Sequence, residues 1–263
     1  MKEETYIPGH SPRVTQFMAG RHADKYAQFF LPYLSSGMSL LDCGCGPGSM
    51  SADLARIVAP GIVTGVDYAK SQIEFARNAQ DYPSNLKFEV GSIYSLPFAA
   101  GEFDAAFSHA LFEHLSEPVE ALREIRRVLK PNGVAGICAP DWSGFIVAPS
   151  SPVLQAAIGY YWNTVQNRNG GDGCVGGKLG GYMLQAGFRD VKMSARYECY
   201  EDLVRIGEYL ANRIDESAEL DRAVERGWAT QDDLKRMADA LREWQQRPDG
   251  MFAQAWVSAV GYG

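Results

Sequence analysis

The sequence of 263 residues lacks the features that mark membrane, secreted and zinc-binding proteins. No apolar run is long enough to cross a bilayer, and residues 1–6 carry no apolar signal-peptide core. We therefore expect a cytoplasmic protein without a membrane span. The five cysteines include no C-x-x-C pair, so no metal site is predicted. We expect Cys43, Cys45 and Cys138 to be small, buried apolar residues and not metal ligands.

Basic clusters are also scarce, since 25 Lys and Arg side chains face 32 Asp and Glu, for a net charge of −7. An acidic chain without a basic patch neutralises phosphates poorly, so no nucleic-acid partner is expected. Apolar side chains, in contrast, make up 46% of the sequence, which is ample for a buried core. The length suits one α/β domain with an elaboration or two small domains, and a monomer and a homodimer both remain open.

Short apolar runs alternate with helical patterns between residues 39 and 140. This alternation predicts βαβ units, and hence a doubly wound α/β fold around a mostly parallel sheet. The expected strands are residues 39–43, 62–66, 86–90, 103–108 and 133–139, and the expected helices are residues 48–58, 70–79 and 117–129. Two later runs, residues 188–195 and 252–260, would bring the sheet to seven strands.

The remaining segments suggest additions to this core. Residues 1–38 are expected to form an N-terminal helical cap, with helical spacing over residues 12–30. A Pro-, Ser- and Gly-rich stretch at residues 141–151 predicts a loop. The core would then comprise residues 39–196 and 251–263. Between them, residues 197–250 have an almost wholly helical pattern, including a capping box at Thr230, and are expected to cover the substrate site.

The most informative segment is residues 40–48, which reads Leu-Leu-Asp-Cys-Gly-Cys-Gly-Pro-Gly. It predicts a strand, a tight glycine turn and then a helix whose first N–H groups face a ligand. The dinucleotide pattern G-x-G-x-x-G fails because Ser49 stands at its third glycine, which disfavours an NAD-dependent dehydrogenase. A P-loop is excluded because no Gly-Lys-Ser/Thr follows the turn.

The residues that follow each strand are the next candidates, because ligands collect at the carboxyl ends of parallel strands. Asp67 follows the second expected strand, where its carboxylate could accept hydrogen bonds from both ribose hydroxyls of a nucleoside. The same carboxylate could instead only cap the next helix. Ser92 and Ile93 follow the third strand, and His109 follows the fourth.

The acidic-x-Gly-x-Gly-x-Gly pattern from Asp42 to Gly48 resembles the first motif of class I S-adenosylmethionine-dependent methyltransferases. Residues 98–115 and 129–133 resemble the ubiquinone/menaquinone-biosynthesis subgroup of small-molecule methyltransferases. The resemblance is strong over residues 38–140 and looser beyond. It implies a Rossmann-like methyltransferase fold with a helical insertion before the last strand. It also implies S-adenosylmethionine as cofactor and S-adenosylhomocysteine as product.

The resemblance further implies roles for residues of the strand ends and of the N-terminal segment. One position departs from the pattern, because Ser92 stands where many relatives carry Asp, and a neutral hydroxyl accepts a weaker hydrogen bond. The implied cofactor contacts are Gly44, Cys45 and Gly46 to the methionine and ribose, Asp67 to the ribose diol, Tyr68 and Gln72 to the adenosine, Ser92 and Ile93 to the adenine, Ser108 and His109 to the methionine end, and Tyr6, His10 and Arg21 as a cover.

The expected reaction is methyl transfer to a small, partly apolar molecule through an O, C or N atom, by in-line displacement. His109 or His10 is the candidate base. Trp, Tyr, Met and Leu side chains in residues 141–175 and 201–247 suggest the apolar character of the acceptor. Two alternatives stay open: an arsenite methyltransferase using Cys174 and Cys199, and a protein that binds S-adenosylmethionine without catalysis.

Overall fold

The computed structural model describes residues 12–79, 81–160, 162, 170–215 and 224–263. Its centre is a seven-stranded sheet of order β3-β2-β1-β4-β5-β7-β6. The strands are β1 (Leu40–Cys43), β2 (Val63–Asp67), β3 (Leu86–Val90), β4 (Phe103–His109), β5 (Leu129–Ala148), β6 (Arg189–Cys199) and β7 (Met251–Tyr262). The main helices are α1 (Pro12–Ala19), α2 (Ala23–Tyr26), α3 (Ser49–Val58), α4 (Lys70–Arg77), α5 (Pro118–Val128), α6 (Pro152–Tyr160), α7 (Leu179–Gln185), α8 (Leu203–Asp215) and α10 (Gln231–Trp244).

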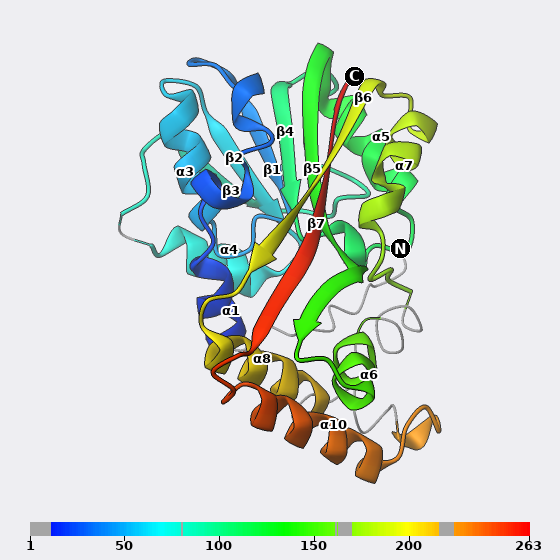
Figure 1. Cartoon of the computed structure of the whole chain (residues 1–263). Coiled ribbons are helices and arrows are strands. Elements are labelled where there is room, and N and C mark those ends of the chain that lie inside the picture. Colours follow the sequence, from blue (N-terminus) through cyan, green and yellow to red (C-terminus); the bar gives the residue numbers. More distant parts are fainter. Residues whose placement is uncertain (1–11, 80, 161, 163–169, 216–223) are drawn as a thin grey trace.

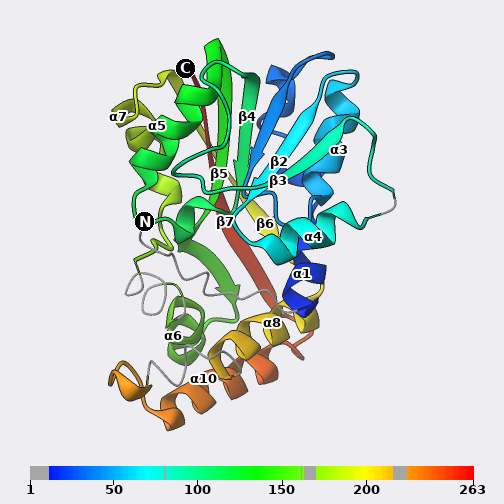
Figure 2. The same ribbon diagram turned by 180° about the vertical axis from the view of Figure 1, so that it is seen from behind.

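The predicted doubly wound, mostly parallel sheet is confirmed. Strands β1 to β5 pair in parallel, whereas β7 runs antiparallel to both of its neighbours, β5 and β6. Helices cover both faces, with α3 on one and α5 and α7 on the other (Figures 1 and 2). Since the parallel strands share a direction, their carboxyl ends meet at one edge of the sheet.

A second apolar core lies at that edge, where α6, α8 and α10 pack together below the sheet (Figure 1). Phe252 of β7 and Trp142 of β5 belong to this core and connect it to the sheet. Thr230 caps α10 as predicted, because its hydroxyl oxygen accepts the N–H of Asp233 at 3.1 Å. None of the described helices is long and apolar enough to cross a membrane.

Two sequence-based expectations about local structure are wrong. The helix expected over residues 12–30 is broken at Gly20, and α2 is only one turn long. The loop expected at residues 141–151 is largely strand, because β5 continues to Ala148. After an irregularity it pairs again with β7, where Ile146 faces Ala253. The backbone of the long strand β7 pairs with this part of β5, and local sequence patterns do not reveal such a long-range pairing.

Gly136 of β5 provides a test of how the N-terminal segment is attached to the sheet. A Cβ atom at this position would lie 2.2 Å from the buried Phe30 ring, which packs on the sheet with Phe107. We expect Gly136→Ala to lower the free energy of unfolding by about 1–3 kcal/mol through overpacking. Denaturant unfolding measures this loss. The control is Gly181→Ala in α7, where nothing lies within 4 Å, and we expect it to stabilise the helix by about 0.5–1 kcal/mol.

Candidate active site

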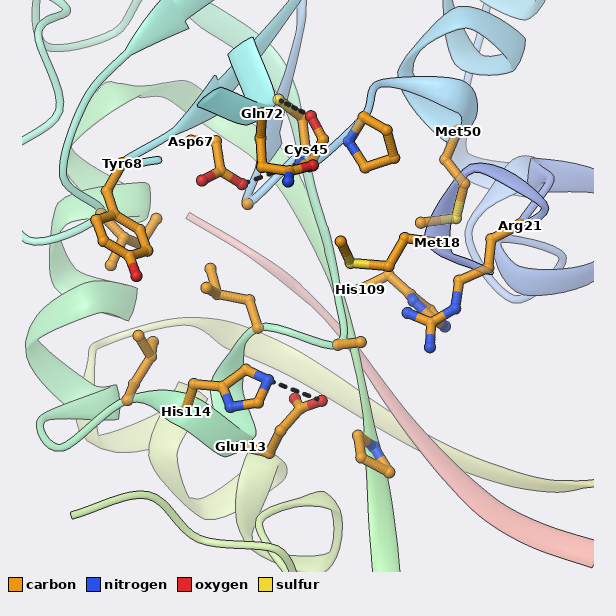
Figure 3. A pocket seen from close by; sticks show the side chains of 18 of the residues that line it. Met18, Arg21, Cys45, Met50, Asp67, Tyr68, Gln72, His109, Glu113 and His114 are labelled. Carbon is orange, nitrogen blue, oxygen red and sulfur yellow. Dashed lines mark hydrogen bonds and ion pairs between the residues drawn. The ribbon is translucent and has the colours of Figure 1, made fainter. Parts of the chain in front are cut away.

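A cavity of about 490 Å³ opens where the carboxyl ends of β1 to β4 face the helices below the sheet. One half is formed by the glycine bend after β1 and the ends of β2 and β3. The other half is formed by aromatic side chains of β5, β7 and α8. Figure 3 shows Asp67 and Tyr68 on one side, and Met18 and Arg21 on the other. The size is ordinary for a small-molecule site.

The glycine bend takes the form that the sequence predicts. Gly44, Gly46 and Gly48 all have positive φ angles, of 73°, 52° and 84°. Nothing lies within 4 Å of the place where a Cβ of Gly46 would be. The bend therefore exposes its backbone to the cavity, as a ligand that lies along it requires.

Asp67 is joined to this bend by hydrogen bonds. Its Oδ2 accepts the N–H of Gly46 at 3.0 Å, and its Oδ1 accepts the N–H of Ala69 at 2.9 Å. The carboxylate thus supports the start of α4 and lines the cavity at the same time. A carboxylate has about four acceptor positions, so an aspartate at this place has the chemistry to accept from ribose hydroxyls.

Asp42, the acidic residue of the motif, does not line the cavity. It is 2% exposed and accepts the hydroxyl of Ser51 at 2.5 Å, which ties β1 to α3. Burial raises the pKa of its carboxyl to about 7. We therefore assign it to holding the bend and α3 together.

The residues expected near adenosine come together on the far side of Asp67. Tyr68, Gln72, Ser92 and Ile93 all line the cavity, as does the buried Cys45. Gln72 donates from Nε2 to the hydroxyl of Thr15 in α1 at 3.0 Å, which links this wall to the N-terminal segment. Burial keeps the pKa of the Cys45 thiol well above its usual value, so this thiol is a neutral contact.

The structure does not bring together every residue that the sequence proposed. Ser108 is fully buried within the sheet and donates to the carbonyl oxygen of Cys43 at 3.0 Å. It is absent from the cavity wall because alternate strand residues face opposite sides, and its hydroxyl is used by the neighbouring strand. Tyr6 and His10 lie outside the described residues.

Arg21 reaches the cavity from the N-terminal segment. The hydroxyl of Ser49 donates to the Arg21 carbonyl at 2.9 Å, so the start of α3 fixes this backbone. The guanidinium carbon lies 5.7 Å from the ring centre of Trp256 in β7. The backbone of Arg21 is therefore fixed, and its positively charged guanidinium lies beside the bend.

His109 lies behind Arg21 and Met18 in Figure 3. Its ring stacks on Trp256 with centroids 4.6 Å apart, and it meets the edge of Tyr26. Within the described part of the chain, neither ring nitrogen has a hydrogen-bond partner. Burial, with help from Arg21 and Arg196, lowers its pKa well below the usual value, so the ring is neutral. A strongly lowered pKa makes it a weak base.

Glu113 is a candidate that the sequence reasoning missed. It follows β4 in a short 3-10 turn, is 3% exposed and lines the cavity. Burial raises the pKa of its carboxyl to about 7, against the opposing charges of Arg21 and Arg213. Its Oε1 lies 3.8 Å from Nε2 of His114 (Figure 3), but burial lowers the His114 pKa to about 3, so that ring is neutral. The sequence does contain one sign of this residue: Glu113 is a carboxylate placed shortly after a predicted strand, between the apolar residues Phe112 and Leu115.

The aromatic half combines positions that are far apart in the sequence. The rings of Trp142 and Trp162 stack 4.3 Å apart, and both line the cavity. Arg213 of α8 lies 5.4 Å from the Trp162 ring centre and 4.6 Å from that of Tyr209. No local pattern identifies Arg213 or Trp256, because only the tertiary fold brings α8 and β7 to this edge.

The thiols needed for an arsenite site do not converge here. Cys174 is half-buried and Cys199 is exposed, and neither lines this cavity. No group of three or more potential metal ligands occurs within the described ranges. Cys43, Cys45 and Cys138 are buried and free, as the sequence predicted.

The sequence of this chain is similar to those of known methyltransferases. Residues 41–137 match the family model described as a methyltransferase domain. An uncharacterized methyltransferase of Schizosaccharomyces pombe is 27% identical over 94% of this chain and 92% of its own length. The demethylmenaquinone methyltransferase of Lactococcus lactis is 31% identical over 49% of this chain and 50% of its own. This chain spans about half the length of several other curated relatives that it matches.

The fold is also that of solved methyltransferases. Phosphoethanolamine N-methyltransferase 2 of Haemonchus contortus, crystallised with S-adenosylhomocysteine, superposes with a TM-score of 0.54 at 17% identity. That match covers 87% of this chain and 49% of the other. Residues 41–137 are therefore a methyltransferase domain, and the relatives and the fold that this chain resembles are those of S-adenosylmethionine-dependent methyltransferases, as the sequence motifs predicted.

Proposed function

We propose that the protein transfers the methyl group of S-adenosylmethionine to a small, partly apolar acceptor held in the aromatic half of the cavity. The observation that carries this proposal is that one continuous cavity is lined both by the bend with Asp67 and by the aromatic wall. A donor on the bend and an acceptor on the wall would meet near Leu111 and Glu113. Alignment of two reactants in this way can contribute about 7–11 kcal/mol to catalysis.

The described residues fit the cofactor. The open face of Gly46 leaves room for the methionine and ribose, and the Asp67 carboxylate lines the same cavity, where it would accept from the two ribose hydroxyls. The apolar side chain of Ile93 and the hydroxyl of Ser92 suit one face and one edge of adenine. The Ser92 oxygen already accepts the N–H of Tyr94 at 3.3 Å, so backbone groups of this turn would share the recognition of the adenine amino group.

When bound, S-adenosylmethionine would supply a methyl group on a sulfonium: an electron pair of the acceptor would form a bond to the methyl carbon while the carbon–sulfur bond breaks, and neutral S-adenosylhomocysteine would leave as the thioether. The chain's own part is to hold the acceptor in line, to exclude water with Trp142, Trp162 and Trp256, and to take up a proton. Glu113 is the better base at neutral pH, because its pKa of about 7 lies near the working pH. His109, with its lowered pKa, remains a weaker candidate.

Arg21 is proposed to bind the methionine carboxylate of the cofactor, because it holds a positive charge beside the bend. We expect Arg21→Gln to weaken S-adenosylhomocysteine binding by roughly 10- to 100-fold, the worth of a charged hydrogen bond. Calorimetry measures this change. The matched control is Arg123→Gln on α5, where an exposed arginine pairs with Glu120. Equal affinity in Arg21→Gln and the wild type would remove Arg21 from the cofactor site.

Two measurements together test the proposed function. Calorimetry with S-adenosylmethionine, S-adenosylhomocysteine and NAD should show binding of the first two alone. Labelled S-adenosylmethionine is then offered with phenols, quinones together with a chemical reductant, amines and arsenite, and label should enter a phenol or the reduced quinone. A protein that binds the nucleoside but never transfers label to any class would instead be a non-catalytic binder. Binding of NAD in preference would overturn the proposal.

A further inference from the structure

The aromatic rings of the acceptor half are already occupied by positive charges. Arg213 lies 4.6 Å from the ring centre of Tyr209 and 5.4 Å from that of Trp162. Arg21 lies 5.7 Å from the ring centre of Trp256. Aromatic faces attract cations at these distances, and this attraction is how many proteins bind ammonium ligands. Here the protein's own guanidinium groups take that role.

The other rings around the cavity add no positive charge of their own. Trp142 presents one face to Trp162, at a centroid distance of 4.3 Å. Burial lowers the pKa values of His109 and His114, so both rings are neutral at pH 7. Two permanent positive charges, Arg21 and Arg213, therefore line the cavity, and among the described residues the carboxyls that line it are those of Glu113 and of Asp67 on the side of the bend.

We propose that the acceptor binds as an anion: a planar molecule whose carboxylate or ionised hydroxyl lies against Arg213, while ammonium compounds are excluded. A guanidinium binds such oxygens through two parallel hydrogen bonds. A cationic acceptor would meet like charges in a site where water is largely displaced and Coulomb terms are strong. This inference rests on the proposed function, and it names the charge class of its substrate.

The arrangement also separates the roles of the two arginines. Arg21 lies beside the bend and Trp256, on the side proposed for the cofactor's methionine end. Arg213 lies on α8 beside Trp162 and Tyr209, on the acceptor side. Arg213 is therefore the residue that should set the charge preference without affecting the cofactor.

Four probes that share a naphthalene ring test this preference: 1-naphthoate, 1-naphthol, 1-naphthalenemethanol and 1-naphthylmethylammonium. Their binding at pH 7.5 is measured by quenching of tryptophan fluorescence, with and without S-adenosylhomocysteine. We expect naphthoate to bind at least about tenfold more tightly than the neutral alcohol, as a charged hydrogen bond would provide. The ammonium compound should bind more weakly than the alcohol. Tightening of naphthol at higher pH would show that an ionised hydroxyl serves as well as a carboxylate.

Variants at position 213 complete the test. Arg213→Gln should remove the preference for naphthoate, and Arg213→Lys should retain part of it. Arg226→Gln is the matched control, because Arg226 lies 5.0 Å from the Trp228 ring centre and lines no part of this cavity. An unchanged dissociation constant for S-adenosylhomocysteine in Arg213→Gln shows that the fold is intact.

Two results would overturn the inference. One is ammonium binding as tight as naphthoate binding in the wild type, and the other is an undiminished naphthoate preference in Arg213→Gln. Failure of the nucleoside to bind would count against the proposed function instead. The relative affinities of the four probes are also measured without S-adenosylhomocysteine, so these affinities still decide the charge class of the acceptor.

Discussion

Replacement of Asp67 by Ala is expected to weaken S-adenosylhomocysteine binding by at least about 100-fold. Two charged hydrogen bonds to the ribose hydroxyls would be lost, each worth about 1.5–3 kcal/mol. The Gly46 N–H would also lose its acceptor, which lies 3.0 Å away, and the bend would lose its support. Asp67→Asn should lose less, because its amide oxygen can still accept a hydrogen bond. Calorimetry with the purified variants measures both changes.

Asp104 offers a matched control at the opposite end of the sheet. Its carboxylate accepts the N–H and hydroxyl of Ser39 at 2.9 and 2.7 Å, and it pairs with Lys130. These contacts lower the pKa of Asp104, so Asp104→Asn should cost some stability. It should leave the affinity for S-adenosylhomocysteine unchanged. Wild-type affinity in Asp67→Ala would show that the nucleoside binds elsewhere.

Glu113→Gln is expected to lower kcat by about 100- to 10,000-fold, the usual worth of a positioned base. The carboxyl must be ionised to accept a proton, and its pKa is about 7, so wild-type turnover should rise with pH through about 7 and then level off. The groups around it are Arg21 before α2, Arg213 on α8, the neutral His114, and Cys138 on β5. Turnover in Glu113→Gln should lack the step near pH 7.

Stability provides the control for this variant. Burial raises the folded-state pKa of Glu113 above its ordinary value, so the folded state loses stability as pH rises toward about 7. Glu113→Gln removes that cost, and its free energy of unfolding at pH 8 should match or exceed that of the wild type. Low turnover would then reflect the lost base. Retention of the pH step in Glu113→Gln would assign that step to another group, with His109→Ala as the next variant to measure.

The sequence predicts the glycine bend and the strand ends beside it, because local patterns define them. Glycines that need positive φ, a strand before them and a helix after them occur within one short segment, residues 40–58. Asp67 is the last residue of β2 and Ile93 lies shortly after the end of β3, and parallel strands bring such positions to one edge. Ser108 does not line the cavity whereas the next residue, His109, does, since neighbouring strand residues point to opposite faces.

The sequence predicts that residues 141–175 and 197–250 lie over the substrate site, but it does not predict which of their side chains line the cavity, because long-range pairing selects them. β7 returns antiparallel between β5 and β6, which places Trp256 beside His109 and extends β5 through the expected loop. Arg213 lines the cavity only because α8 packs below the sheet. No spacing within residues 197–260 indicates these contacts.

The most direct measurement of the central claim is a crystal structure of the protein with S-adenosylhomocysteine. We predict both ribose hydroxyls within hydrogen-bonding distance of the Asp67 carboxylate, the thioether sulfur beside the Gly44–Gly46 bend, and the aromatic half open in front of the sulfur. A nucleoside seated away from Asp67, or one whose sulfur faces away from Glu113 and the aromatic wall, would contradict it.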